Sequence, residues 1–249
     1  MKIAIVAVAG ISSRFNQNEE EAVLKGIYTT TDDRKTLLYS ILRKCVGFDK
    51  VVLVGGYQYE KLESYIEAHK KEFPFLIQLV HNRHYSDLGT GYTLKVGLEE
   101  CLKEDTCSEI VLIEGDLFFD EASFEQVKDS DRSVATYNQK VIYSNKAVIA
   151  YVDLQKRLRY VFSTSHGAVQ IPEPFLEIYN SGQIWKFADI HIVRKLIGKL
   201  PQEAWEGTNL RFVEAYFGQI KEEERQMLPL NIWENCNTRD DYLEYASQL

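Results

Sequence analysis

Four short apolar runs alternate with helix-like segments in the first half of the sequence, and this alternation is the strongest constraint on the fold. The runs cover residues 3–10, 50–57, 76–82 and 109–116. They are nearly continuous stretches of Val, Ile, Leu and Ala, a pattern typical of strands that are covered on both faces of a sheet. A sheet of such strands needs a crossover between each pair.

The segments between the runs supply those crossovers. They cover 36–46, 59–73 and 90–103, and in the second of them Leu62 and Ile66 fall on one helical face. The β-α-β-α-β-α-β order predicts an α/β fold with a mainly parallel sheet and right-handed crossovers.

The second half changes character. Short segments richer in Tyr, Ser and charge are expected to form an antiparallel extension or edge strands, and they lie at 133–138, 146–153, 158–164 and 167–171. Helical patterns return at 188–199, 208–221 and 239–247. Because no low-complexity linker or repeat interrupts the chain, we expect a single domain over 1–249.

Composition narrows the class of protein. The formal net charge of -8 argues against general nucleic-acid binding. The four cysteines form no CxxC pair, so free thiols in a reducing cytoplasm are expected. The N-terminal apolar run leads straight into a turn motif and is interpreted as a strand rather than a signal peptide, and no run reaches the ~20 apolar residues of a membrane span. We therefore expect a cytoplasmic protein that binds neither membranes nor nucleic acids.

Ligands of open parallel sheets bind beyond the carboxyl ends of the strands. The segment after the first run, AGISSRF at 9–15, combines Gly10, small Ser12 and Ser13, and Arg14. Exposed backbone N–H groups in such a turn can hold an anion, and an arginine can grip phosphate oxygens with two hydrogen bonds. From these residues alone, a plain strand–helix turn with a surface arginine is an equally good interpretation.

Two more residues carry possible chemistry. Lys25 lies among apolar neighbours and is suited to offset phosphate charge, although a surface lysine often looks the same. Asp116 ends the fourth run in EGDLFFD, where a carboxylate can hold Mg²⁺ or cap a turn. Glu114 can share this site or face away from it.

In order and spacing, these motifs resemble the nucleotidyltransferase family of the sugar-phosphate and choline-phosphate type. The resemblance covers nearly the whole chain and is carried by AGxxSRF, by Lys25 before KTLLYSIL, and by VVLVGGY, HNRHYSDLGTGYTL, IEGDLFF and WENCNTRDDY. It is closest to small single-domain cytidylyltransferases that act on phosphocholine or aminoethylphosphonate. It implies a Rossmann-like, GT-A-like three-layer α/β/α sandwich with a mainly parallel mixed sheet, whose residues 1–120 bind nucleotide and whose residues 121–249 bind the acceptor.

The resemblance also implies roles for single residues. Arg14, Lys25 and Asp116 are the expected catalytic residues. Nucleotide-binding positions are expected at Ala9, Gly10, Ser12, Ser13, Arg14, Lys25, Asn82 and Thr93. The metal ligands would be Asp116 and Asn237, and the family has an aspartate where this chain has Asn237. Because an amide brings no charge, metal binding without triphosphate should be weaker.

The implied reaction is Mg²⁺-dependent transfer of a nucleoside monophosphate, CMP from CTP, to a small phosphorylated or phosphonate acceptor such as phosphocholine, with release of pyrophosphate. Aromatic walls with a nearby acid would suit an ammonium group of the acceptor. On that basis the acceptor site is expected at Tyr57, Tyr92, Trp185, Asp189 and Glu214, although aromatic residues more often build the core. An oligomer is compatible with the sequence.

Three alternatives remain open at the level of sequence. Asn237 favours a nucleotide-binding or regulatory protein with weakened catalysis on the same fold. A sugar phosphate can replace phosphocholine as acceptor. A glycosyltransferase of related fold would need a second aspartate after the fourth run, and GDL at 115–117 lacks it.

Overall fold

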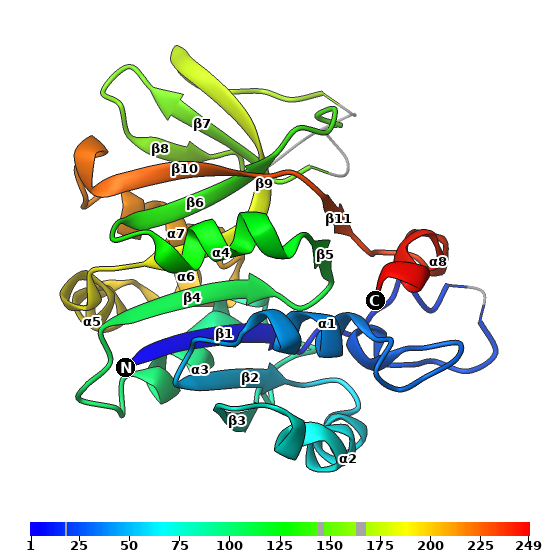
Figure 1. Ribbon diagram of the computed structural model, residues 1–249. Coiled ribbons are helices and arrows are strands. Elements are labelled where there is room, and N and C mark those ends of the chain that lie inside the picture. Colours follow the sequence, from blue (N-terminus) through cyan, green and yellow to red (C-terminus); the bar gives the residue numbers. More distant parts are fainter. Residues whose placement is uncertain (18, 144–146, 163–167) are drawn as a thin grey trace.

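The computed structural model describes residues 1–17, 19–143, 147–162 and 168–249. Within these residues, nine strands form one sheet, with a main path in the order β10-β6-β9-β4-β1-β2-β3 and with β7 and β8 attached to β9 (Figure 1). The strands of this sheet are β1 (Lys2–Val8), β2 (Lys50–Gly55), β3 (Leu76–His81), β4 (Glu109–Glu114), β6 (Ser133–Asn138), β7 (Ile149–Asp153), β8 (Leu158–Tyr160), β9 (Phe175–Phe187) and β10 (Arg225–Leu230). A separate two-stranded sheet pairs β5 (Leu117–Phe119) with β11 (Trp233–Asn235).

The main path of the sheet is parallel except at one strand. β1, β2, β3 and β4 pair in parallel, and β6 pairs in parallel with β10. The long strand β9 runs antiparallel between β4 and β6 and extends past them to pair with β7. The predicted mainly parallel mixed sheet is thereby confirmed.

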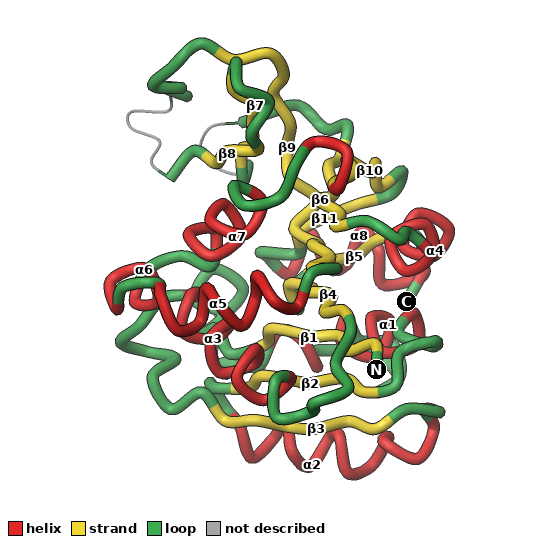
Figure 2. The backbone as a smooth tube through the Cα atoms, turned by 90° about the vertical axis from the view of Figure 1, so that its left-hand side faces the viewer, coloured by secondary structure: helices red, strands yellow, loops and turns green. Residues whose placement is uncertain are grey.

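Helices cover both faces of the sheet and make three layers (Figures 1 and 2). The helices on one face are α1 (Leu37–Lys44), α2 (Tyr59–His69) and α4 (Glu121–Asp129). Those on the other are α3 (Thr90–Cys101), α5 (Ile190–Lys199), α6 (Gln202–Glu206) and α7 (Leu210–Phe217). The last helix, α8 (Arg239–Tyr245), packs beside the loop after β1, and single 3₁₀ turns lie at η1 (Lys25–Ile27), η2 (Lys70–Glu72), η3 (Glu222–Glu224) and η4 (Ala246–Gln248).

The two-sided core explains the continuous apolar runs. Ile3 and Ile5 of β1 enter the cluster under α3 and α7, whereas Ala4 and Val6 enter the cluster under α1. Each fully buried Val, Leu or Ile side chain is worth roughly 1.5–3 kcal/mol. A polar residue at alternate positions would therefore break one of the two cores.

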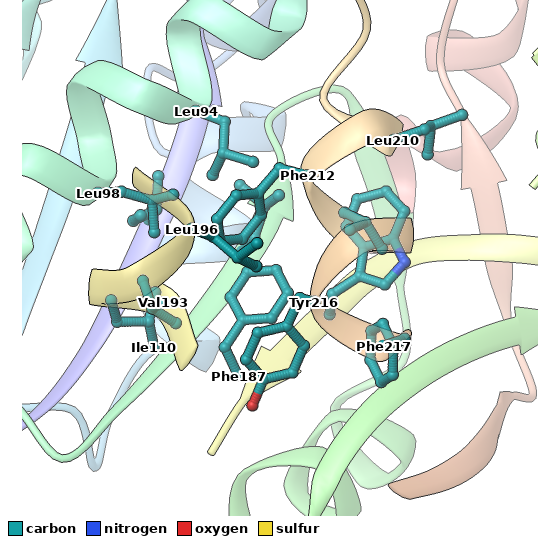
Figure 3. Close-up of a cluster of buried hydrophobic side chains, with 14 of the residues drawn as sticks. Leu94, Leu98, Ile110, Phe187, Val193, Leu196, Leu210, Phe212, Tyr216 and Phe217 are labelled. Carbon is teal, nitrogen blue, oxygen red and sulfur yellow. The ribbon is translucent and has the colours of Figure 1, made fainter. Parts of the chain in front are cut away.

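The larger cluster is rich in aromatic rings (Figure 3). Phe187 of β9 packs edge-on against Phe212 and Tyr216 of α7, with ring centroids 5.3 and 4.8 Å apart. These contacts fix α7 against the end of β9 and so set the position of the residues at the start of α7.

The second half departs from the sequence-based prediction in several elements. β6 was expected in an antiparallel extension or at an edge but lies inside the sheet, whereas β7 and β8 do form an antiparallel extension. Residues 168–171 form no strand, and residue 167 lies outside the described residues. The full length of β9 was not predicted, because its centre is the polar stretch Asn180–Gln183, which interrupts the apolar pattern of a strand. Helix α4 was not predicted either.

Candidate functional site

The carboxyl ends of the first four parallel strands lie level with one another. In the strand register, Ala7 is opposite Glu114, and Gly55 is opposite both Val8 and His81. The loops that follow are joined by backbone hydrogen bonds, from Tyr57 N–H to the Ala9 carbonyl (3.1 Å) and from Asn82 N–H to the Gly55 carbonyl (2.8 Å). The predicted convergence of these loops at one sheet edge is therefore observed.

A cavity of about 140 Å³ opens at this edge. Its walls come from the end of β1 and its turn, from η1, from the start of α3 and from the end of β4. The lining residues are Ala7, Val8, Ala9, Gly10, Ser12, Leu24, Lys25, Gly26, Thr90, Thr93, Glu114, Gly115 and Asp116. Six of the expected site residues therefore line one cavity together with Glu114: Ala9, Gly10, Ser12, Lys25, Thr93 and Asp116.

The turn after β1 takes its unusual conformation at a serine. Ser12 has φ of 56°, in the left-handed region that non-glycine residues seldom adopt. A Cβ added to Gly10 would meet nothing within 4 Å, so space does not demand glycine at that position. The Ser12 hydroxyl accepts a hydrogen bond from Lys25 N–H at 3.3 Å, which ties the turn to η1. Ser13 is exposed and is not among the residues that line the cavity.

Lys25 and Asp116 form an ion pair inside the cavity. The distance from Lys25 Nζ to Asp116 Oδ2 is 2.8 Å, and the two side chains are 15% and 25% exposed. This partial burial makes the pair stronger than an exposed surface pair. The lysine and aspartate that the sequence singled out, 91 residues apart, are therefore direct neighbours.

A second pair joins the two ends of the chain. Arg14 Nη2 donates a hydrogen bond to Asn237 Oδ1 at 2.8 Å. The backbone of the preceding residue, Cys236, donates to the Asp116 carbonyl at 2.9 Å, which brings position 237 close to Asp116 along the chain. Asn237 N–H in turn donates to Asp241 Oδ2 at 3.0 Å. The expected arginine and the expected second metal ligand are thus bonded to each other.

Glu114 is the site residue that the sequence left undecided, and it faces the cavity. The pKa of Glu114 is raised to about 7, mainly because the carboxyl group is buried away from solvent and secondly because the negative charge of Asp116 is near. Its carboxylate accepts a hydrogen bond from Asn209 Nδ2, and Asn209 N–H donates to Thr90 Oγ1 at 3.1 Å. Asn209 precedes α7 and resembles an ordinary helix-start residue, so no sequence signal marked it as part of this site.

Asn82 supports the site without lining the cavity. It is fully buried, its amide donates to Thr93 Oγ1 at 2.9 Å, and its carbonyl oxygen accepts from His84 N–H at 2.8 Å. Asn82 therefore holds the loop after β3 against α3, and Thr93 presents its other side to the cavity.

The residues expected to bind the acceptor do not gather at the cavity. Tyr57 is half-buried in the loop after β2, and Tyr92 is half-buried in the first turn of α3. Trp185 is 1% exposed, and its Nε1 donates to Tyr160 at 2.7 Å, so it belongs to the core. Glu214 accepts from Tyr160 N–H at 2.7 Å and pairs with Arg159 at 3.3 Å.

The expectation for Asp189 needs correction. Phe187, at the end of β9, pairs with Ile110 at the start of β4. Asp189 therefore lies at the opposite edge of the sheet from Asp116. There it caps α5 by accepting hydrogen bonds from His191 and Ile192 N–H at 2.9 and 3.2 Å. The sequence suggested no antiparallel β9, so the reversal of chain direction before Asp189 was missed.

Asp116, which lines the cavity, and Asn237, which is not among its lining residues, carry oxygen atoms that could hold a magnesium ion. Mg²⁺ prefers hard oxygen ligands and is commonly held by one or two protein groups together with substrate phosphates. Asp116 could supply a carboxylate oxygen. Asn237 could supply its side-chain carbonyl oxygen, because the residue before it, Cys236, is hydrogen-bonded to the backbone carbonyl of Asp116. Within the described residues, no group of three or more His, Cys, Asp or Glu side chains is placed to hold a metal ion by itself.

Comparison with solved structures shows the same fold in three nucleotidyltransferase-like proteins, each covering nearly the whole of both chains. An inositol-1-phosphate CTP transferase from T. maritima is 16% identical, with a TM-score of 0.67 over 100% of this chain and 96% of its own. A Bacillus anthracis protein assigned as a glucose-1-phosphate thymidylyltransferase, in complex with a sucrose, is 14% identical, with a TM-score of 0.71 over 100% and 94%. A CTP:phosphocholine cytidylyltransferase from Streptococcus pneumoniae is 16% identical, with a TM-score of 0.64 over 99% and 98%.

These likenesses confirm the predicted Rossmann-like nucleotidyltransferase fold. No curated protein matches the sequence significantly. In the part of the chain that the structure describes, none of the helices has the length and apolar character of a membrane span. A family model matches residues 21–249, and the chain therefore belongs to the family described as a domain of unknown function, DUF6564.

Proposed function

We propose that this protein is a Mg²⁺-dependent nucleotidyltransferase that transfers a nucleoside monophosphate to a small phosphorylated or phosphonate acceptor and releases pyrophosphate. The observation that carries the proposal is the meeting of Lys25 and Asp116 in a cavity at the carboxyl edge of the sheet. Arg14 follows the turn after β1, which is hydrogen-bonded to Lys25 through Ser12. The shared fold with enzymes named for CTP or sugar-phosphate substrates supports it.

The proposed chemistry needs few groups from the protein. An oxygen of the acceptor's phosphate attacks the α-phosphorus of the triphosphate, and the bond from that phosphorus to the pyrophosphate oxygen breaks. Because a phosphate monoester is already a nucleophile near neutral pH, a general base is not required. Bound magnesium would offset charge on the phosphate oxygens.

The residues of the cavity would position and neutralise the triphosphate. Lys25 and Arg14 would bind phosphate oxygens, and Lys25 starts from a position beside Asp116. Asp116 and Asn237 would hold the metal. The turn at 9–13, with Ser12 in its left-handed conformation, would present backbone N–H groups to the nucleotide.

We further propose CTP as the donor and phosphocholine, aminoethylphosphonate or a sugar phosphate as the acceptor. The resemblance of the motifs to small cytidylyltransferases supports CTP. The names of the structural neighbours include CTP transferases and a thymidylyltransferase and therefore leave room for another base.

Pyrophosphate release tests the proposal. The protein is incubated with Mg²⁺, each of the four nucleoside triphosphates, and a panel of phosphocholine, aminoethylphosphonate and sugar phosphates. Release is expected with at least one acceptor and is expected to be fastest with CTP. The proposal fails if no triphosphate and acceptor pair gives pyrophosphate above the buffer blank.

The variant Asp116→Asn tests the proposed metal role of Asp116. It removes one carboxylate charge while keeping the size of the side chain, so we expect turnover to fall at least about 100-fold, as when a charge-stabilising group is lost. Circular dichroism should show an unchanged fold. Full turnover in this variant would contradict the metal role of Asp116.

A second candidate function follows from the residue at position 237. An amide there, bonded to Arg14, favours a nucleotide-binding protein that has lost turnover. Such a protein would bind a nucleoside triphosphate by calorimetry yet release no pyrophosphate with any acceptor of the panel.

A further inference from the structure

The cations and the oxygen ligands of the site are paired with one another. Lys25 Nζ lies 2.8 Å from Asp116 Oδ2, and Arg14 Nη2 lies 2.8 Å from Asn237 Oδ1. In each pair, one member is suited to phosphate and the other to a metal ion. The protein's own residues therefore occupy the atoms that both ligands would need.

Hydrogen bonds hold the backbone at one member of each pair. The backbone N–H of Lys25 donates a hydrogen bond to the Ser12 hydroxyl, and the Lys25 side chain is only 15% exposed. The backbone N–H of Asn237 donates a hydrogen bond to Asp241 Oδ2. The same carboxylate oxygen accepts a second hydrogen bond, from Thr238 N–H at 2.7 Å. The backbones thus stay in place while the ends of Lys25 and Arg14 remain able to turn.

Each ligand alone must compete with one of these contacts. A metal ion that approaches Asp116 meets an ammonium group at 2.8 Å, and a triphosphate that approaches Lys25 must draw it from a carboxylate. When both bind, Lys25 and Arg14 move to phosphate oxygens, and the oxygens of Asp116 and Asn237 are released for the metal. With both ligands bound, Lys25, Arg14 and Asp116 would each have a partner of opposite charge, which matters most in a partly buried site.

We infer that Lys25 and Arg14 couple metal binding to triphosphate binding by exchanging partners, so that the free site resists either ligand alone. This inference rests on the proposed function, because it takes a nucleoside triphosphate and a divalent cation as the ligands. Coupling of this kind is reciprocal: the factor by which the metal tightens triphosphate binding equals the factor by which the triphosphate tightens metal binding.

The inference makes an unusual prediction for Lys25→Met. Removing the ammonium group frees Asp116, so the variant should bind a divalent cation without nucleotide more tightly than the unmodified protein. Mn²⁺ is the probe, and free Mn²⁺ is counted by electron paramagnetic resonance. We expect Mn²⁺ affinity to rise about tenfold, equivalent to roughly 1.4 kcal/mol, while affinity for the non-hydrolysable triphosphate α,β-methylene-CTP falls at least tenfold.

Two further variants distinguish the proposed exchange of partners from a general effect of removing one positive charge on Mn²⁺ affinity. Lys35→Met removes the same charge from a half-buried lysine outside the cavity and should leave Mn²⁺ affinity within twofold. The double variant Lys25→Met, Asp116→Asn should lose the gain. Circular dichroism and the melting temperature check that each variant is folded.

The outcomes decide the inference independently of turnover. It is overturned if Lys25→Met binds Mn²⁺ no more tightly than the unmodified protein, if Lys35→Met gains as much, or if neither protein binds Mn²⁺ with or without the triphosphate analogue. Failure to release pyrophosphate, by contrast, affects only the proposed function, because the Mn²⁺ measurement involves no reaction.

Discussion

At the scale of single residues, the site depends on side chains that hold one another. Asn209 is 5% exposed and donates to the Glu114 carboxylate, which lines the same cavity as Asp116. Its own N–H is bonded to Thr90 at the start of α3. The carboxylate of Glu114 is therefore oriented by the residue just before α7, which lies 95 positions away in the chain.

Replacing Asn209 by alanine tests this support. Glu114 would lose its hydrogen-bond donor in a partly buried place, so we expect the free energy of unfolding to fall by about 1–3 kcal/mol. Urea denaturation followed by fluorescence measures this change. Gln219→Ala, an exposed substitution at the other end of α7, should cost less than about 0.5 kcal/mol. An equal loss in both variants would contradict the support by Asn209.

The residues of the site were predictable in part. Lys25 and Asp116 stood out because a charged residue in or just after an apolar segment needs a partner, and each is the partner of the other. Asn209 was missed because its role arises from the packing of α7 on the sheet. Asp189 was misplaced because an acid near an aromatic segment carries no information on which edge of the sheet it occupies.

At the scale of elements, α8 packs against the segment that follows the turn carrying Arg14. Its Tyr242 is fully buried, packs edge-on against Tyr28 at 5.1 Å and donates to the Lys35 carbonyl at 2.8 Å. Tyr28 packs in the same way against Phe15, the residue after Arg14. A chain of three aromatic rings therefore links α8 to the turn that carries Arg14.

Truncating this chain of rings should lower the stability of the fold. Tyr242→Ala removes a buried aromatic side chain, and we expect a loss of about 3–5 kcal/mol in the free energy of unfolding. Tyr242→Phe keeps the ring and removes the hydrogen bond to Lys35, so it should lose only about 1 kcal/mol. Thermal denaturation of the two variants separates ring packing from the hydrogen bond. Equal melting temperatures would contradict the packing role of the ring.

The elements themselves were predicted best where both faces are buried. β1, β2, β3 and β4 follow apolar runs and were located within two residues of their ends. β9 was missed because it has a polar centre, with Gln183 at φ of 57° and a shift in its pairing with β6. A strand of this kind is held by its neighbours, and a local sequence pattern does not reveal it.

At the scale of the whole molecule, all four cysteines lie in the interior. Cys45, Cys101, Cys107 and Cys236 are buried free thiols. Burial raises the pKa of Cys45 to about 12 and that of Cys236 to about 12, and it raises the pKa values of the other two as well. The thiolate is the reactive form, so these groups should be inert in the folded protein at ordinary pH.

These pKa values also give a pH dependence. The folded state keeps these thiols protonated while the unfolded state releases their protons near pH 9. The unfolded state therefore binds fewer protons, and the free energy of unfolding should fall as pH rises from 9 toward 12. Urea denaturation at pH 8 and pH 10 tests this sign, and stability that rises over this range would contradict it. As a control, a thiol reagent at pH 8 should label the native protein slowly and all four thiols in urea.

The contact between Arg14 and Asn237 spans 223 positions of the chain. Synthesis runs from the N-terminus, so the turn that carries Arg14 is made long before residue 237, and Arg14 cannot make this contact until β11 has been made. Any fragment that ends before β11 would carry Lys25 and Asp116 without this last contact. In synthesis from the N-terminus, the contact of Arg14 with Asn237 is therefore the last of these site contacts that can form.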